Sequence, residues 1–152
     1  MTKQIYQSIE KQLLAVNGIK SVSLYNGSIQ QLDKSLTYPA ALVLFDATSY
    51  TDGVNGYQVG AYNLVIYILI KGAHKEVLQA LDLVDRVAKG LHKFSPTADC
   101  SPMMRKGETM PDVFTDLFVF EQSYEFTCVD YGVVTASETI EAEGLTVSLT
   151  LD

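Results

Sequence analysis

The chain has 152 residues, of which 47% are hydrophobic and 19% are charged, and its formal net charge is −7. These values predict a single globular domain and argue against a disordered chain. The acidic balance argues against a free-standing nucleic-acid binder, because such proteins present a basic face to phosphates. No apolar run approaches the roughly 20 residues that span a bilayer, and the first residues lack an apolar signal core, so we expect no membrane span and no secretion signal.

The N-terminal part of the chain predicts one helix and two short strands. A helix is expected over residues 3–16, with Thr2 as its N-cap and Asn17-Gly18 as its stop. Its apolar residues form one stripe at helical spacing: Ile5, Ile9, Leu13 and Val16. Strands are expected over residues 19–25 and 40–45, with polar loops over residues 28–38 and 46–57.

The most informative segment is a long predicted strand over residues 57–71. Its centre, Leu64 to Ile70, is apolar without interruption and rich in β-branched residues. A strand with one wet face alternates apolar and polar residues, whereas both faces here are apolar. Val65, Tyr67 and Leu69 occupy the second face, and we expect another copy of the chain to supply part of its cover.

A second helix is expected over residues 75–94. Its apolar stripe is Val77, Leu81, Val84, Ala88 and Leu91, flanked by Leu78 and Val87. A long loop with three prolines follows over residues 95–112. Its methionines and basic residues are typical of an adaptable contact surface: Met103, Met104, Arg105, Lys106 and Met110. The alternative is an ordinary surface loop whose methionines cover the edge of the core.

The C-terminal part predicts an alternating strand over residues 113–130 and an acidic extension over residues 132–152. The extension ends in a strand whose apolar side is Val147, Leu149 and Leu151, and this strand is a candidate to pair with a neighbour's sheet edge. The predicted fold class is α+β, as one domain over residues 1–152. An antiparallel or mixed sheet with a long β-hairpin is packed by two helices, in the order α-β-β-β-α-β plus a C-terminal strand.

We find no catalytic, cofactor-binding or metal-binding pattern. His74 and His92 would lie roughly 27 Å apart on one helix, too far to share a metal. Cys100 and Cys128 are too few for a disulfide framework and are expected to be free thiols. Glycines over residues 53–60 precede a strand rather than a helix, so they predict turns and not a phosphate loop.

The order of these elements resembles the tail terminator, or tail completion, proteins of long-tailed bacteriophages and prophages. The landmarks are the helix from Lys3, the segment Tyr38-Pro39-Ala40-Ala41-Leu42-Val43 leading a strand, the long strand 57–71, the helix 75–94 and the alternating strand 118–130. The resemblance covers roughly residues 3–131 and is one of pattern, without a catalytic signature. The extension from Gly132 lies outside it.

This resemblance implies a structural protein and not an enzyme. It implies a hexameric ring that caps the tail tube, ends its polymerisation and offers a docking surface to the head–tail connector protein. DNA would pass through such a ring without specific binding, which suits an acidic chain. Assembly would take place in the host bacterial cytoplasm, and the product would be part of the virion tail, with no membrane partner and no cofactor. Two alternatives remain: a head-closure or neck connector protein, and a small ligand-binding or enzymatic α+β domain.

Overall fold

The computed structural model describes residues 1–72, 77–114, 116–131, 139–142 and 145–148. The elements, in chain order, are α1 (Thr2–Leu14), β1 (Ser21–Leu24), α2 (Ile29–Asp33), β2 (Ala40–Asp52), η1 (Val54–Gly56), β3 (Gln58–Lys71), α3 (Val77–Leu91), β4 (Met104–Phe114), β5 (Leu117–Asp130), β6 (Thr139–Ala142) and β7 (Leu145–Ser148).

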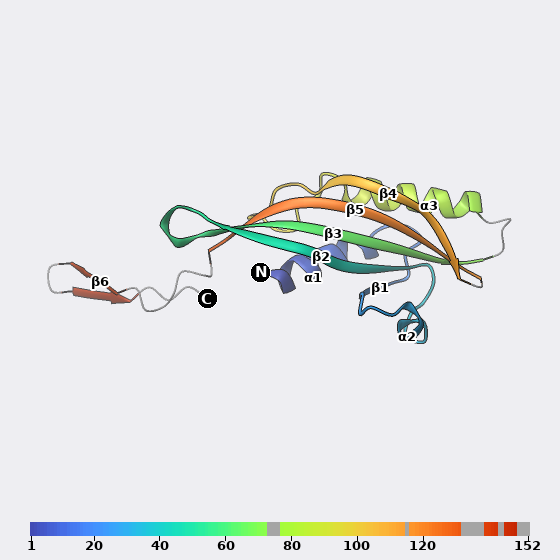
Figure 1. Ribbon diagram of the computed structural model, residues 1–152, viewed down its shortest axis with the longest axis horizontal. Coiled ribbons are helices and arrows are strands. Elements are labelled where there is room, and N and C mark those ends of the chain that lie inside the picture. Colours follow the sequence, from blue (N-terminus) through green and yellow to red (C-terminus); the bar gives the residue numbers. More distant parts are fainter. Residues whose placement is uncertain (73–76, 115, 132–138, 143–144, 149–152) are drawn as a thin grey trace.

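The described strands form a five-stranded mixed sheet in the order β1-β2-β3-β5-β4, together with a separate two-stranded sheet of β6 and β7 (Figure 1). β1 runs parallel to β2, and the other neighbours are antiparallel. The predicted α+β class, with a mixed sheet, packed helices and a long hairpin, is therefore confirmed. In the five-stranded sheet β3 is the central strand, and β1 and β4 form the two edges.

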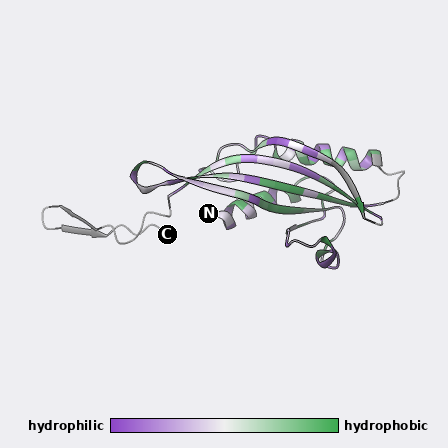
Figure 2. Cartoon of the chain, in the orientation of Figure 1, coloured by the Kyte–Doolittle hydropathy of each residue, from purple (hydrophilic) through white to green (hydrophobic). Residues whose placement is uncertain are grey.

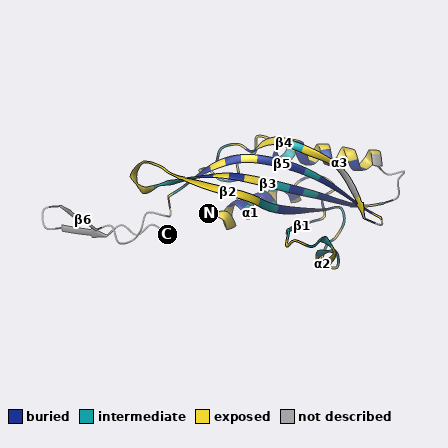
Figure 3. Cartoon of the chain, viewed as in Figure 1, coloured by how far each residue is buried: buried dark blue, intermediate teal, exposed yellow. Residues whose placement is uncertain are grey.

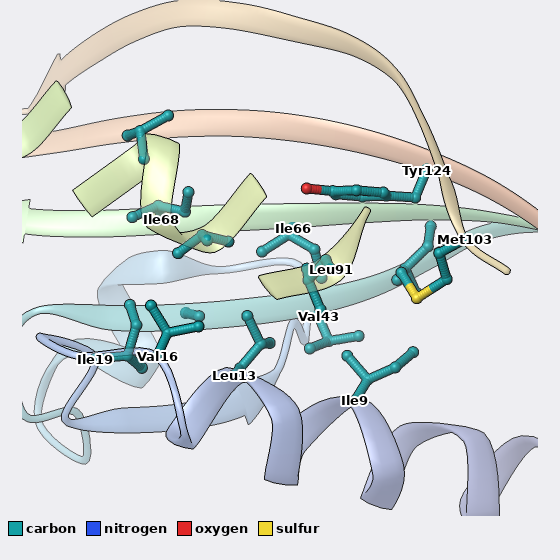
Figure 4. Packing of buried hydrophobic residues seen from close by; sticks show 14 of the residues in the cluster. Ile9, Leu13, Val16, Ile19, Val43, Ile66, Ile68, Leu91, Met103 and Tyr124 are labelled. Atoms are coloured by element: carbon teal, nitrogen blue, oxygen red, sulfur yellow. The ribbon is translucent and has the colours of Figure 1, made fainter. Parts of the chain in front are cut away.

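Helices α1 and α3 cover the same face of this sheet, which we call the inner face. The stripe predicted for α1 is confirmed, since Ile5, Ile9 and Leu13 are fully buried. They pack with Leu64, Ile66 and Ile68 of β3 and with residues of β2, β5 and α3 in one continuous core (Figure 4). At about 25 cal/mol per Å² of buried apolar surface, a core of this extent supplies most of the stabilising free energy.

The predicted cap of α1 is wrong in detail. Met1 is the N-cap, and Thr2 lies inside the helix without a side-chain capping bond. The helix ends at Leu14 with Ala15 as its C-cap, two residues before the predicted end, and Gly18 lies in the turn that follows with φ of +107°, a conformation that favours glycine.

The apolar stripe predicted for α3 is confirmed in part, since Val84, Ala88 and Leu91 are buried. Leu81 is 44% exposed and Leu78 is 78% exposed. The residues that the helix buries are Ala80, Leu83, Val84, Val87, Ala88 and Leu91. The helix carries two overlapping sets of apolar residues at helical spacing. The set that includes the small Ala80 faces the sheet. Two leucines expected in the core are therefore left at the surface.

The outer face of the sheet is covered at one end only, by α2 and the segment after it. A polar loop was expected here, but Ser28 caps a short helix by accepting a hydrogen bond from the Gln31 N–H at 3.3 Å. Ile29 and Leu32 of this helix pack on the outer face together with Leu36 and Tyr38. Helix α2 is thus a third cover element in addition to the two helices that were predicted.

Strands β2 and β3 form a hairpin that is longer than expected. β2 continues to Asp52 instead of ending at Phe45, and its register with β3 shifts at a β-bulge between Phe45 and Ala47. We call residues 46–63 the arm. Its turn projects beyond the helices, and most of its β2 half is exposed (Figures 1 and 3). Hydrophobic residues gather in the body, and the arm is mostly polar (Figure 2).

Candidate functional site

Part of the second face of β3 is shielded within the protomer itself. Leu69 is fully buried within one protomer, because α2 and its neighbours lie over it. Val65 and Tyr67 are half-buried, and the Tyr67 ring packs against that of Tyr25 with centroids 4.9 Å apart. The expectation that this face needs a second copy is therefore wrong for Leu69. For Val65 and Tyr67 the expectation stays a prediction. The next residue on the outer face, Asn63, is exposed.

The second half of the segment predicted as a loop over residues 95–112 belongs to the edge strand β4, which pairs with β5 from Met104 onward. Met103 is fully buried in the core, so it cannot contribute to a contact surface. Met104 is 41% exposed, and Arg105 and Lys106 are exposed along the edge. The side chain of Met110 lies outside the described part of the structure.

Polar contacts fix the position of β4. The Arg105 N–H donates to His92 Nδ1 at 3.2 Å, and Lys106 Nζ lies 3.8 Å from Glu125 Oε2. Gln122 is fully buried and donates through Nε2 to Val84 O at 3.0 Å and to Glu108 Oε1 at 2.9 Å. This amide therefore joins β5 to both α3 and β4.

In the C-terminal extension the structure describes only residues 139–142 and 145–148. Val147 lies in β7, opposite Ile140 of β6. Leu149 and Leu151 lie outside the described residues. The role expected for this strand at a neighbour's sheet edge stays a prediction.

The cysteines are not the free thiols that the sequence predicts. Cys100 and Cys128 form a disulfide, with their Cα atoms 4.0 Å apart, and Cys100 forms an isolated bridge beside β5. The pairing could not be read from the sequence, because the segment before β4 gave no sign that it lies along β5. His74 lies outside the described residues, so its predicted separation from His92 has no counterpart in the structure. Among the described residues, no group of three or more metal-ligating side chains could hold a metal.

Exposed apolar side chains gather at the end of the arm, where the sequence predicted a polar loop. Val54 is 80% exposed, Tyr50 is 48% exposed and Tyr131, just after β5, is 42% exposed. The rings of Tyr57 and Tyr131 make an edge-on contact with centroids 4.6 Å apart. We call Tyr50, Val54, Tyr57 and Tyr131 the arm tip.

The arm tip is supported by packed aromatic side chains, Tyr62 and Phe126, which we call the aromatic base. Tyr62 stacks on Phe126 with centroids 5.1 Å apart, and its hydroxyl lies 3.4 Å from that of Tyr50. Burial, followed by the hydrogen bond with Tyr50, raises the pKa of Tyr62 to about 12. A Cβ at Gly60 would lie 2.9 Å from the Tyr62 ring and 3.0 Å from the Tyr50 ring, so glycine is required for this packing. The sequence carries no regular signal for this half of the arm, because Tyr50 is a single aromatic residue within the polar segment Thr48 to Asp52.

A recess lies at the opposite end of the sheet, between α2 and the end of β3. Its volume is about 410 Å³, and Asp33, Lys71 and Asp116 contribute its charged groups. Asp33 accepts a hydrogen bond from the Tyr38 hydroxyl and lies 3.4 Å from Lys71 Nζ. The Tyr38 hydrogen bond, together with Lys71, lowers the pKa of Asp33. Asp33 and Lys71 therefore satisfy one another instead of presenting an unpaired group to a ligand.

Comparisons with known proteins add little. No family model matches the chain, and no curated protein matches it. Among solved structures the chain is similar to one described as "Virion of native gene transfer agent (GTA) particle". The TM-score is 0.49 and the identity is 11%, over 82% of this chain and 91% of that chain. A likeness of this size carries no argument about function. No helix within the described residues is long and apolar enough to cross a membrane.

Proposed function

We propose that this chain is a structural subunit of a phage-type tail, and that copies of it form a ring that caps the tail tube. The ring would end polymerisation of the tube and offer a docking surface to the head–tail connector protein. The proposal rests on the pattern resemblance over residues 3–131 and on the surfaces that one protomer leaves exposed. Its action is binding and closure, so it requires no catalytic group and no cofactor.

The observation that carries the proposal is the arm. A hairpin that projects beyond its own core, with Val54 80% exposed at its turn, gains nothing for its own fold from that side chain. Exposed apolar groups on a projecting element are typical of interaction sites. The arm and the helix-covered body differ in shape, so contact between them from copy to copy would be heterologous, the arrangement that generates rings.

Charge is consistent with a ring around DNA. A net charge of −7 disfavours adsorption of phosphates to its walls, so DNA would slide and not bind. The open half of the outer face, where Val65 and Tyr67 are half-buried, is a further candidate for contact with the tube or a neighbour. Met104, Arg105 and Lys106 on the exposed edge β4 are a third candidate.

The test is electron microscopy of the purified chain mixed with tail tubes of the same phage or prophage. We expect rings at tube ends and shorter tubes when the chain is present during polymerisation. Binding to the portal complex and not to tube ends would instead indicate a head-closure protein. Tubes that remain uncapped at saturating protein would overturn the proposal.

The C-terminal extension has a separate test. We propose that residues 132–152, a segment separate from the arm, mediate assembly. Deletion of these residues should weaken ring formation as measured by light scattering in the presence of tubes. A ring of unchanged mass and stability would show that the extension does not mediate assembly, and would leave the capping role intact.

A further inference from the structure

The arm tip is acidic as well as apolar. Asp46 and Asp52 are exposed on the arm, and no lysine or arginine occurs between residues 46 and 70. The Asp52 carboxylate accepts a hydrogen bond from Gln58 Nε2 at 3.0 Å, which holds it beside the turn. The tip thus combines Val54 and three tyrosines with a fixed negative charge.

The opposite end of the molecule carries a recess with complementary properties. It has a volume of about 240 Å³ and lies between α3, the end of β3 and the turn after α1. Its apolar lining includes Ile70 and Leu83, and its basic residues are Arg86 and Lys71, of which Lys71 is paired with Asp33. We call it the end recess.

Side chains at the rim extend this character. Arg86 Nε donates to Asn17 O at 2.9 Å, which fixes the guanidinium at the rim. Gln79 and Ala80 of α3 line the recess. Leu78 precedes them at the start of the helix and is 78% exposed. The end recess therefore combines an apolar lining with the guanidinium of Arg86, and an exposed leucine lies next to it in sequence on α3.

The two sites cannot meet within one protomer. Gln58 beside the arm tip and Lys71 in the end recess are the two ends of β3, which has 14 residues. At roughly 3.3 Å per residue they lie about 43 Å apart. Complementary sites at opposite ends of one rigid strand can be satisfied only between copies.

We propose that the arm tip of one copy docks in the end recess of the next copy, with Val54 against Leu78 and Asp52 facing Arg86. The inference rests on the proposed ring and specifies its contact. Because the arm tip and the end recess differ, every copy uses both surfaces. Successive contacts close into a ring if the rotation between neighbouring copies permits it. Burial of the exposed apolar side chains supplies the driving force, and the charge pair fixes the orientation.

The first test is disulfide cross-linking between copies. Val54→Cys and Leu78→Cys are made as single variants, mixed at high concentration and oxidised mildly. Cys100 and Cys128 are buried and paired with each other, so they do not compete. We expect a mixed dimer that forms at least about tenfold faster than in the control mixture of Val54→Cys with Gln31→Cys, because docking raises the effective concentration of the pair. Gln31 is exposed on α2 and does not line the end recess.

Equal rates in the two mixtures would overturn the proposed contact. Faster dimerisation of Val54→Cys alone would also overturn it, because that result means tip-to-tip contact. If rings cap tubes while these pairs do not cross-link, only the contact fails. If the pairs cross-link while tubes stay uncapped, only the capping role fails.

The second test exchanges the charges. Asp52→Arg and Arg86→Asp should each slow the cross-linking several-fold in the cysteine variants, and a mixture in which each copy carries both changes should restore it. Thermal unfolding of each variant separates loss of the contact from loss of the fold. Failure of the combined exchange to restore cross-linking in folded protein would overturn the pairing of Asp52 with Arg86.

Discussion

The two faces of β3 are equally apolar in sequence and very different in the folded protein. On the inner face Leu64, Ile66 and Ile68 are all fully buried beneath α1 and α3. On the outer face burial declines along the strand, from Leu69 through half-buried Tyr67 to exposed Asn63. An apolar run therefore tells us that a face requires cover, but not whether the cover comes from the same chain.

The largest expected effect lies on the inner face. Ile66→Ala should lower the free energy of unfolding by about 4 kcal/mol, because it removes a fully buried side chain from a core that cannot collapse around the cavity. Urea denaturation monitored by circular dichroism measures the change. A loss below about 1 kcal/mol would contradict the two-helix cover of this face.

A smaller but still large effect is expected for Leu69→Ala on the outer face. We expect a loss of about 3 kcal/mol because α2 buries this side chain within the protomer. Val65→Ala is the matched control, on the same face and half-buried, and should cost about 1 kcal/mol or less. Equal losses at low protein concentration would mean that α2 does not cover Leu69 preferentially.

The cover that α2 provides over the outer face can be weakened at the N-cap of this helix. Ser28→Ala removes the side-chain acceptor for the Gln31 N–H and should cost about 1 kcal/mol. Ser28→Asp, which preserves an acceptor at the helix N-terminus, should restore most of the loss. Hydrogen exchange at residues 29–33 measures the effect, and unchanged protection in Ser28→Ala would argue against the capping bond.

The smallest expected effect on stability near neutral pH is that of Tyr62, in the aromatic base of the arm, because its contribution changes only at alkaline pH. The folded-state pKa of Tyr62 is about 12, above its ordinary value near 10. The folded state thus holds its proton where the unfolded chain loses it, and stability falls as pH rises from about 10 toward 12. Tyr62→Phe should flatten this part of the alkaline unfolding curve. An identical curve for the variant would show that Tyr62 does not contribute to it.

Hydrophobic periodicity in the sequence correctly predicted the elements that bury one face at regular spacing. The stripe of α1 and the alternation of Phe118, Phe120, Tyr124 and Phe126 on β5 both correspond to buried inner-face positions. The stripe of α3 was predicted only in part: Val84, Ala88 and Leu91 are buried, whereas Leu81 and the flanking Leu78 are exposed, although they fit a helical face as well as the buried residues do. Sequence spacing cannot decide between two overlapping stripes when packing against a sheet makes the choice.

Other elements left no regular pattern. β4 is an edge strand with two register shifts, and its bulges break the alternation that identifies a strand. β2 beyond Phe45 and the short helix α2 are polar because one side of each faces water. The arm tip and the end recess were missed for a related reason: their residues are adjacent only through strand pairing and helix packing, which the linear sequence does not display.

The extra residue at the bulge between Phe45 and Ala47 has a consequence for insertions and deletions. Before the bulge Phe45 lies opposite Leu64, and after it Ala47 lies opposite Asn63, so Asp46 is the residue without a cross-strand partner in the register. Removing Asp46 would join Phe45 directly to Ala47 and restore regular alternation, with Ala47 still opposite Asn63 and Tyr50 still opposite Gly60. Tyr50 would therefore keep its contact with Tyr62. The bulge is the reason that Phe45 and Tyr50, an odd-numbered and an even-numbered residue, lie on the same side of the hairpin. Length variation in related chains should therefore be tolerated at the bulge as well as at the turn.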